Sequence, residues 1–311
     1  MKRASYLPLL LILFIITTFS YAAADETSST DIEPRQPLLF GAFTYGGVWR
    51  GMEPVYELET DLNRQLDIVH WFMNWDHRWD ATLVGQAAHG GRRPLISWQP
   101  HTQEVRDIAA GSYDAYIRSW AQGAKAHSGP VYLRPFPEMN GDWLGWNGEP
   151  EALVAAWQRM VHIFEEEGAS NVRWVWSPNV TDWPRTEANR MENYYPGEAY
   201  VDVLALDGYN FGDTRDWGGW RSYDEVFEHG YTRVAGLGSQ PVWIAEIASA
   251  ESGGDKGAWI KDMLNSTSFP RVEAIVWFDE QKSADWRLRS SDATLRALRE
   301  GLSGLSVISE E

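Results

Sequence analysis

Eight short apolar runs constrain the fold of this chain more than any other feature of its sequence. They lie at residues 38–43, 66–72, 94–98, 131–133, 172–176, 201–206, 242–245 and 274–278. Most runs are continuous rather than alternating, which indicates strands buried on both faces, as in a parallel sheet that helices cover. The stretches between the runs show helical periodicity. Eight strand–helix units in a chain of 311 residues predict an α/β fold, the (β/α)8 TIM barrel.

Several of the intervening stretches carry helix signals. Apolar residues line one face of the stretch 151–166, and Ser222 with Glu225 forms a capping box ahead of another apolar face. Further helices are expected at 256–264 and 293–305. Because no linker or internal repeat interrupts the pattern, we expect a single domain.

The first residues have the layout of a secretory signal. Lys2 and Arg3 precede an apolar stretch that is too short to span a bilayer comfortably, and three alanines follow it. We therefore expect a signal peptide at 1–24, a polar segment at 25–36 and the barrel domain at 37–308. The mature protein would be secreted or periplasmic, without a membrane partner, and a retained N-terminal anchor is the alternative.

The composition excludes several classes of function. The chain has no cysteine, and so neither a disulfide nor a thiolate metal site. Its formal net charge of −17 disfavours nucleic acid and anionic membranes as partners. The histidines show no ligand spacing with acidic residues. We therefore expect no metal and no cofactor, and a monomer.

The 18 tryptophans point to a carbohydrate ligand, because flat indole faces stack on sugar rings. Most of them are expected in the core. Trp143, Trp146, Trp217 and Trp220 lie among Gly, Asp and Asn residues, where burial is less natural, and are expected at a substrate surface.

Two glutamates are the main candidates for catalysis. Glu138 and Glu246 each follow the end of an apolar run, and in a barrel the carboxyl ends of the strands carry the reacting groups. Glycosidases use two carboxyl groups that face each other across the bond to be cleaved, one as the acid and one as the nucleophile. Asn140 and Asn179, which follow the fourth and fifth runs, are expected beside them at the substrate.

The surroundings of the two glutamates differ. Glu246 is an isolated charge in an apolar stretch, and burying it ionised requires compensation, for which Arg134 and Tyr209 are the candidates. The alternative is a structural Glu–Arg pair. Glu138 lies between Pro137 and a methionine, surroundings that can raise its pKa and keep it protonated as a general acid. The alternative is an ordinary loop carboxylate.

Three ordered motifs resemble glycoside hydrolase family 26, the β-mannanase family of retaining (β/α)8 glycosidases. They are Arg134-Pro-Phe with Glu138-Met-Asn-Gly-Asp-Trp143, the segment from Tyr194 to Asp202 with Asp207-Gly-Tyr209, and Trp243-Ile-Ala-Glu246. The resemblance runs from about Gly41 to Glu280.

The resemblance implies a role for each matching residue. Glu138 matches the acid/base, Glu246 the nucleophile and Tyr209 the hydrogen-bond donor to the nucleophile. Trp277 matches the platform under the sugar at the cleaved position, and Trp143 an aromatic wall. The chain departs from the family at Pro137, where the family usually has a histidine that contacts the substrate.

The sequence as a whole predicts a secreted retaining β-glycoside hydrolase that acts on a polysaccharide. An endo-β-1,4-mannanase is expected first. The alternatives are a mixed-linkage β-glucanase, a β-1,3-xylanase or an exopolysaccharide hydrolase with the same mechanism, and a glycan-binding barrel that does not cleave. Proline has no side-chain donor, so the contact that the family histidine makes with the substrate is lost or replaced at Pro137. The identity of the polysaccharide depends on this change.

Overall fold

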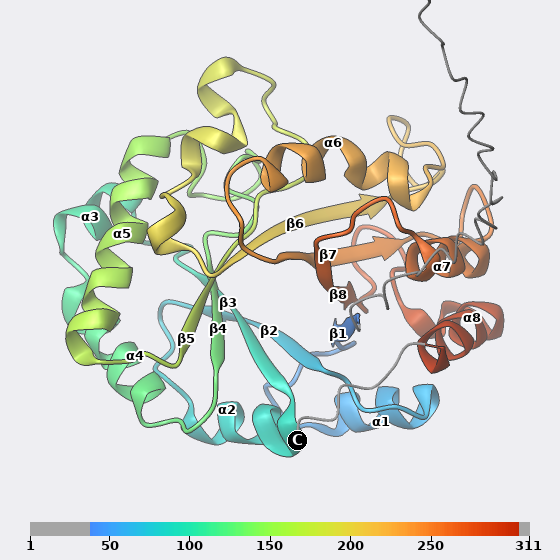
Figure 1. The fold of residues 1–311 in the computed structure, drawn as a ribbon, viewed down its shortest axis with the longest axis horizontal. Coiled ribbons are helices and arrows are strands. Elements are labelled where there is room, and N and C mark those ends of the chain that lie inside the picture. The colour runs from blue at the N-terminus through green and yellow to red at the C-terminus, as the bar shows by residue number, and fades with distance from the viewer. Residues whose placement is uncertain (1–37, 305–311) are drawn as a thin grey trace, which may run out of the picture. The chain divides into compact units, whose positions relative to one another are not determined.

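The computed structural model describes residues 38–304, and within them eight parallel strands close into a barrel in sequence order (Figure 1). The predicted TIM barrel is therefore confirmed, with every apolar run on a strand. The predicted signal peptide (1–24) and polar segment (25–36) lie outside the described residues. The strands are β1 (Leu39–Phe43), β2 (Ile68–Asn74), β3 (Arg93–Gln99), β4 (Val131–Pro135), β5 (Val172–Trp176), β6 (Val203–Asn210), β7 (Val242–Ser249) and β8 (Val272–Phe278).

Helices surround the strands in Figure 1. They are α1 (Glu53–Leu62), α2 (Ala81–Ala88), α3 (Val105–Ala110), α4 (Asp114–Lys125), α5 (Pro150–Glu167), α6 (Tyr223–Ala235), α7 (Lys256–Asn265) and α8 (Asp292–Ser303). The predicted helices agree with α5, α7 and α8 within two residues. The capping box is present at the start of α6, with the Ser222 side chain bonded to the Glu225 N–H and the Glu225 side chain to the Ser222 N–H.

The connection from β5 to β6 departs from the strand–helix alternation. It contains three short 3-10 helices, at Glu187–Asn189, Met191–Tyr194 and Glu198–Tyr200, in place of an α-helix. Prolines at 178, 184 and 196 interrupt this segment, and each removes a backbone donor that a continuous helix would need. The segment lies over the outside of the barrel and supplies part of the polar network at the site.

The barrel interior is filled by a cluster of strand residues. Leu39, Ile68, Leu95, Val175, Val203, Ala205, Trp243, Ala245, Ala274 and Val276 form it, with Tyr132 packed against it. A second, larger cluster lies between the strands and the helices. Since side chains alternate along a strand, membership of the interior cluster shows which residues of each strand point inward.

Several strands run further at their carboxyl ends than the apolar runs indicated. β4 includes Arg134, β6 continues to Asn210 and β7 continues to Ser249, so that Tyr209 and Glu246 lie within strands rather than after them. The polar residues at these strand ends are paired across the sheet, as in Asp207 opposite Glu246. Hydrogen bonding along the strands thus holds the site residues on the rigid part of the barrel.

Candidate active site

A β-bulge turns Glu246 toward the mouth of the barrel. Ala245 belongs to the interior cluster, so strict alternation would point Glu246 outward. The pairing with β6 shifts at this point, from Leu206 opposite Ile244 to Asp207 opposite Glu246. The bulge absorbs one residue of β7 and re-aims the side chain that follows. Two consecutive residues of β7 therefore face the interior.

Arg134 joins Glu246 to Asp207. Its Nη1 donates to Oε1 of Glu246 at 2.6 Å, and its Nη2 donates to a carboxyl oxygen of Asp207. Ser177 donates to the other oxygen of Asp207 at 2.7 Å. Arg134 and Asp207 are fully buried, and Glu246 is 7% exposed. One guanidinium thus serves two carboxyl groups in a place where an unpaired charge is costly.

Burial and charge shift the pKa values of these groups. Burial lowers the pKa of Arg134, but the charges of Asp207 and Glu246 outweigh it and raise that pKa, so the arginine stays charged. Burial raises the pKa of Asp207 well above its ordinary value, against the charge of Arg134. Burial and the charge of Glu246 raise the pKa of Tyr209, so its hydroxyl stays protonated. This hydroxyl donates a hydrogen bond to Oε2 of Glu246 at 2.6 Å.

Ser97 and His70 extend this network. The Ser97 hydroxyl oxygen accepts from Nη1 of Arg134 at 2.9 Å and lies 2.7 Å from Nε2 of His70. Burial and the charge of Arg134 lower the pKa of His70 well below its ordinary value. His70 is therefore neutral.

Glu138 lies in the loop after β4, where the backbone has an unusual conformation. The φ angles of Phe136 and Glu138 are 49° and 53°, in the region that glycine favours. The Glu138 N–H donates to the Ser177 carbonyl oxygen at 2.8 Å, which ties the loop to the end of β5. Residues in such conformations persist where the surrounding structure holds them, and they concentrate at functional sites.

Two donors hold the Glu138 carboxyl group. Nδ2 of Asn179 donates to Oε1 at 2.6 Å, and Nε1 of Trp143 donates to Oε2 at 2.7 Å. Burial raises the pKa of Glu138 and the charge of Glu246 raises it further, whereas the two donors lower it. The net direction is upward, as required of a carboxyl group that must keep its proton above the ordinary glutamate pKa.

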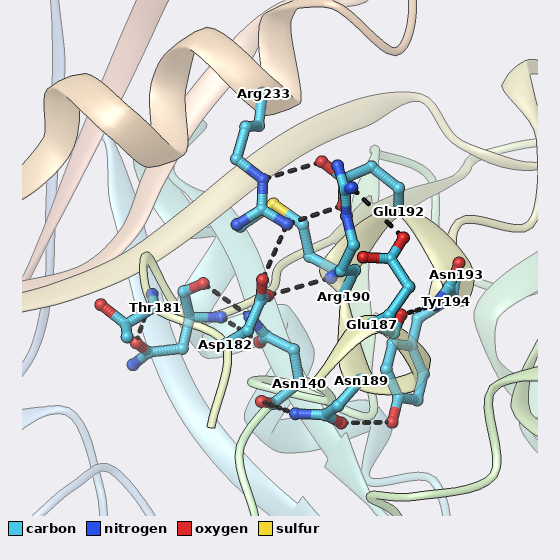
Figure 2. A network of polar contacts seen from close by, with 12 residues as sticks. Asn140, Thr181, Asp182, Glu187, Asn189, Arg190, Glu192, Asn193, Tyr194 and Arg233 are labelled. Atoms are coloured by element: carbon cyan, nitrogen blue, oxygen red, sulfur yellow. Dashed lines mark hydrogen bonds and ion pairs between the residues drawn. The ribbon is translucent and has the colours of Figure 1, made fainter. Parts of the chain in front are cut away.

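A polar network fixes the position of Asn179 (Figure 2). Asn140 is fully buried, and its amide bonds both the carbonyl oxygen of Asn179, at 2.9 Å, and its N–H, at 2.8 Å. Nδ2 of Asn140 also donates to Asp182 at 2.9 Å. Asp182 in turn pairs at 2.8 Å with Arg233, which Figure 2 shows entering from α6. The helix outside the barrel is thereby connected to the loop that carries a donor to Glu138.

Three residues expected at the substrate are instead enclosed by the protein. Arg134 and Asn140 have no exposed surface, and Nη1 and Nη2 of Arg134 and the amide of Asn140 bond within the site. Trp146 is 1% exposed, and its indole N–H donates to the Pro137 carbonyl oxygen at 2.9 Å. Its loop folds back onto the core, so burial is natural there despite the polar neighbours in sequence. These three residues position others and have no surface for a sugar.

Trp277 also differs from its expected place. Ala274 and Val276 belong to the interior cluster, so Trp277 points outward by alternation. Its ring packs against Trp259 of α7, with centroids 6.2 Å apart, and it is fully buried. The inward residue at this level is Phe278. Contrary to the expectation of a sugar platform, Trp277 therefore has no exposed surface on which a sugar could stack.

Other aromatic side chains remain exposed at loops after the strands. Trp143 is 49% exposed and Trp217 is 70% exposed, while Trp220 is half-buried. Trp217 rests edge-on against Phe211, with centroids 4.8 Å apart. Trp143 and Trp217 therefore have free ring surface.

The sequence assigned no role in the site to Asp207, Ser97 or Ser177. Asp207 follows an apolar run in the same way as the two glutamates, so its position carried a usable signal. Ser97 lies inside β3, and Ser177 directly after β5. The role of Ser97 and Ser177 could not be predicted from the sequence, because it depends on which strands face one another in the barrel.

Among residues 38–304, no group of three or more His, Cys, Asp or Glu side chains could hold a metal ion. Within the same range, no helix combines the length and the apolar character needed to cross a membrane.

The fold and the site together define a (β/α)8 barrel with two glutamates at its mouth, an arrangement found in glycosidases. The sequence model of Glycosyl hydrolase family 26 matches residues 99–249, which include both glutamates. This chain belongs to glycoside hydrolase family 26.

Named relatives of this chain are polysaccharide hydrolases. Endoglucanase H of Acetivibrio thermocellus is 39% identical over 272 residues, which cover 82% of this chain and 30% of that protein. A mannan endo-1,4-β-mannosidase of Bacillus subtilis is 30% identical over 166 residues, covering 50% of this chain and 41% of that protein. The chain thus spans less than half the length of either relative.

A solved modular endo-β-1,4-mannanase from Cellulomonas fimi has the same fold. The TM-score is 0.65 at 16% identity, over 85% of this chain and 70% of that one. At this identity the likeness concerns the fold.

Proposed function

We propose that this chain hydrolyses β-glycosidic bonds of a polysaccharide with retention of configuration, and that Glu246 and Glu138 are its catalytic residues. The proposal rests on one observation, which is that the two glutamates have different surroundings. Glu246 is bonded by the cation Arg134 and by Tyr209, whereas burial and the nearby charge raise the pKa of Glu138. Double displacement requires one carboxylate that attacks and one carboxyl group that keeps its proton until the leaving oxygen needs it.

In the first step, an oxygen of Glu246 attacks the anomeric carbon as the bond from that carbon to the leaving oxygen breaks. Glu138 gives its proton to the leaving oxygen, and a glycosyl ester forms on Glu246. In the second step, a water molecule gives a proton to Glu138 and attacks the anomeric carbon. The ester bond breaks, the sugar is released, and both glutamates return to their starting states.

The substrate that we propose first is a gluco-configured β-glucan cleaved within the chain. The identity to Endoglucanase H extends over 272 residues, against 166 for the mannosidase, and thus covers nearly the whole barrel. Pro137 supports a substrate other than mannan, because its buried ring offers no side-chain donor where the family usually has histidine. Mannan is the second candidate, favoured by the mannosidase relative and by the family.

A polysaccharide panel tests both the reaction and the substrate. Purified protein is incubated with mixed-linkage β-glucan, carboxymethyl cellulose, glucomannan, galactomannan and β-1,3-xylan, and reducing ends and product sizes are measured. Soluble oligosaccharides of intermediate size from a glucan would support the proposal. A protein that binds one of these polymers in affinity electrophoresis but releases no reducing ends from any would be a binding barrel, contrary to the proposal.

The site of action that we propose is outside the cytoplasm. The support is the layout of residues 1–24, with two basic residues, an apolar stretch and three alanines. N-terminal sequencing of protein recovered from the culture medium or periplasm should begin at residue 25. A chain that keeps its first residues and sediments with membranes would instead be anchored.

A further inference from the structure

A cavity of about 320 Å³ lies at the carboxyl ends of β1 and β2, outside the site described above. It is lined by Trp49, Phe72, Met73, Asn74 and His77. Since all these residues come from the ends of strands or the loops after them, the cavity opens on the same side of the barrel as Glu246.

Trp49 is held as a platform with a free face. Its indole N–H donates to the Phe72 carbonyl oxygen at 2.9 Å, yet 51% of the residue is exposed. The bond satisfies the polar group of the ring, so the exposed surface is the apolar face. Gly47 allows this arrangement, because a Cβ at that position would lie 2.0 Å from the Trp49 ring. An exposed, anchored indole is the group on which sugar rings stack.

Polar side chains border the same cavity. Asn74 is the last residue of β2 and is exposed, and His77 is 59% exposed at its side chain, with Nδ1 2.7 Å from Asp76. An amide and an imidazole beside an aromatic face can donate to and accept from sugar hydroxyl groups. The lining therefore matches a neutral sugar residue better than a purely apolar ligand.

A row of aromatic rings connects Trp49 with the proposed nucleophile. The Trp49 ring lies 5.9 Å from Phe43, Phe43 stacks at 5.1 Å on Phe278, and Phe278 lies 6.1 Å from Tyr209. Tyr209 bonds Glu246. Each of these three ring-to-ring distances is comparable with the length of one hexose in an extended β-linked chain. At most three sugar residues therefore separate Trp49 from the cleavage point.

The position of the row also fixes the direction of the glycan. β8 and β4 lie opposite each other in the closed barrel, because three strands separate them in each direction. Glu138, after β4, protonates the leaving oxygen, so the part of the chain that leaves extends on its side. Phe278 of β8, Phe43 of β1 and Trp49 in the loop after β1 therefore lie on the side of the barrel toward which the part of the glycan that becomes bonded to Glu246 extends.

We propose that Trp49, with Asn74 and His77, forms a subsite for a sugar residue on the non-reducing side of the bond that is cleaved, two or three residues from it. This inference rests on the proposed function and adds to it where the glycan lies. It predicts that the enzyme gains catalytic efficiency when the substrate is long enough to reach Trp49.

The test uses 4-nitrophenyl β-glycosides with one to four sugar residues, in the configuration that the enzyme cleaves. The measured quantity is the ratio of kcat/KM between the longest and the shortest substrate. In Trp49→Ala this ratio should fall by roughly 3- to 10-fold, the scale of one aromatic stacking contact. Trp49→Phe, which keeps a ring, should retain most of it. A ratio is used because damage to the fold lowers both values together.

Tyr56→Ala is the matched control, since Tyr56 is also an exposed aromatic residue, at 43%, but lies on α1 away from the mouth. A ratio that Trp49→Ala leaves at the wild-type value, or lowers no more than Tyr56→Ala does, would overturn the subsite.

Calorimetric binding of unlabelled oligosaccharides separates this result from a failure of the proposed function. If no glycoside is cleaved but Trp49→Ala still weakens binding of the tetrasaccharide more than that of the disaccharide, the subsite stands and the hydrolysis fails. If cleavage occurs and neither cleavage nor binding depends on Trp49, the subsite fails and the hydrolysis stands.

Discussion

Nη1 of Arg134 lies 2.6 Å from Oε1 of Glu246, although 112 positions separate the two residues in the chain. The same guanidinium bonds Asp207, so its loss leaves two buried carboxyl groups without their cation. Arg134→Met should therefore lower the free energy of unfolding by about 3–5 kcal/mol at neutral pH. Urea unfolding measures it. Arg118→Met, which removes an exposed arginine bonded to Glu166 and Glu167, should leave the midpoint close to that of the wild type. Equal losses would contradict the account of Arg134.

The assignment of the two glutamates predicts different losses. Glu246→Ala should lower turnover by roughly three orders of magnitude or more, and azide should restore product of inverted configuration by entering from the face that the carboxylate leaves free. Glu228→Ala, which removes an exposed glutamate on α6, is the control. Glu138→Ala should spare the first step on substrates whose leaving group needs no proton. Azide rescue that gives retained product would reverse the roles.

Retention also sets the distance between the two carboxyl groups. We expect about 5–5.5 Å, which leaves no room for a water molecule between them and the anomeric carbon. A crystal structure with a bound oligosaccharide measures this distance. Values of about 6.5–9.5 Å would indicate inversion and contradict the double displacement.

The pKa of Glu138 predicts the alkaline side of the pH profile. The first step needs Glu138 protonated, so kcat/KM for natural substrates should fall as the pH rises through its pKa, which lies above the ordinary value of 4.5. The bond from Asn179 lowers that pKa, because it favours the charged form. In Asn179→Ala the alkaline limb should therefore move to higher pH, with lower kcat. A limb that moves to lower pH would assign it to another group.

A substitution of Trp277 tests whether its side chain faces the barrel mouth or packs against α7. Because its ring packs against α7 rather than facing the mouth, Trp277→Phe should cost about 1–3 kcal/mol of stability through lost packing. At a temperature where the variant is folded, its kcat/KM should be close to that of the wild type. A loss of activity beyond tenfold without a loss of stability would restore Trp277 as a sugar platform.

Glu192 predicts the behaviour of the fold in acid. Bonding by Arg233 lowers the pKa of Glu192 from 4.5 to about 2. The unfolded chain therefore binds this proton at a higher pH than the folded one, and stability falls as the pH drops from about 5 to about 2. Glu192→Gln should reduce the slope of unfolding free energy against pH in that window by about one proton. Urea titrations at several pH values measure the slope, and an unchanged slope would contradict the shift.

The sequence predicted the barrel because burial on both faces of a parallel strand leaves a continuous apolar run that needs no knowledge of the partner strand. It also predicted Arg134 and Tyr209 as partners of Glu246, since an isolated charge in an apolar stretch requires compensation. The Trp277 interpretation failed because a family match gives the order of residues, whereas the inward face of β8 is set by period-two alternation. Trp146 could not be placed because its burial depends on how its loop returns to the core.

One guanidinium faces three carboxyl groups at the mouth of this barrel, since the charge of Arg134 acts on Asp207, Glu246 and Glu138. The chain around it is strongly acidic, with a net charge of −17. A sugar that carries its own carboxylate would approach these groups across an acidic protein surface, which disfavours its binding. We therefore expect polysaccharides built from uronic acids, such as alginate or pectin, to bind more weakly at the cleavage point than neutral ones.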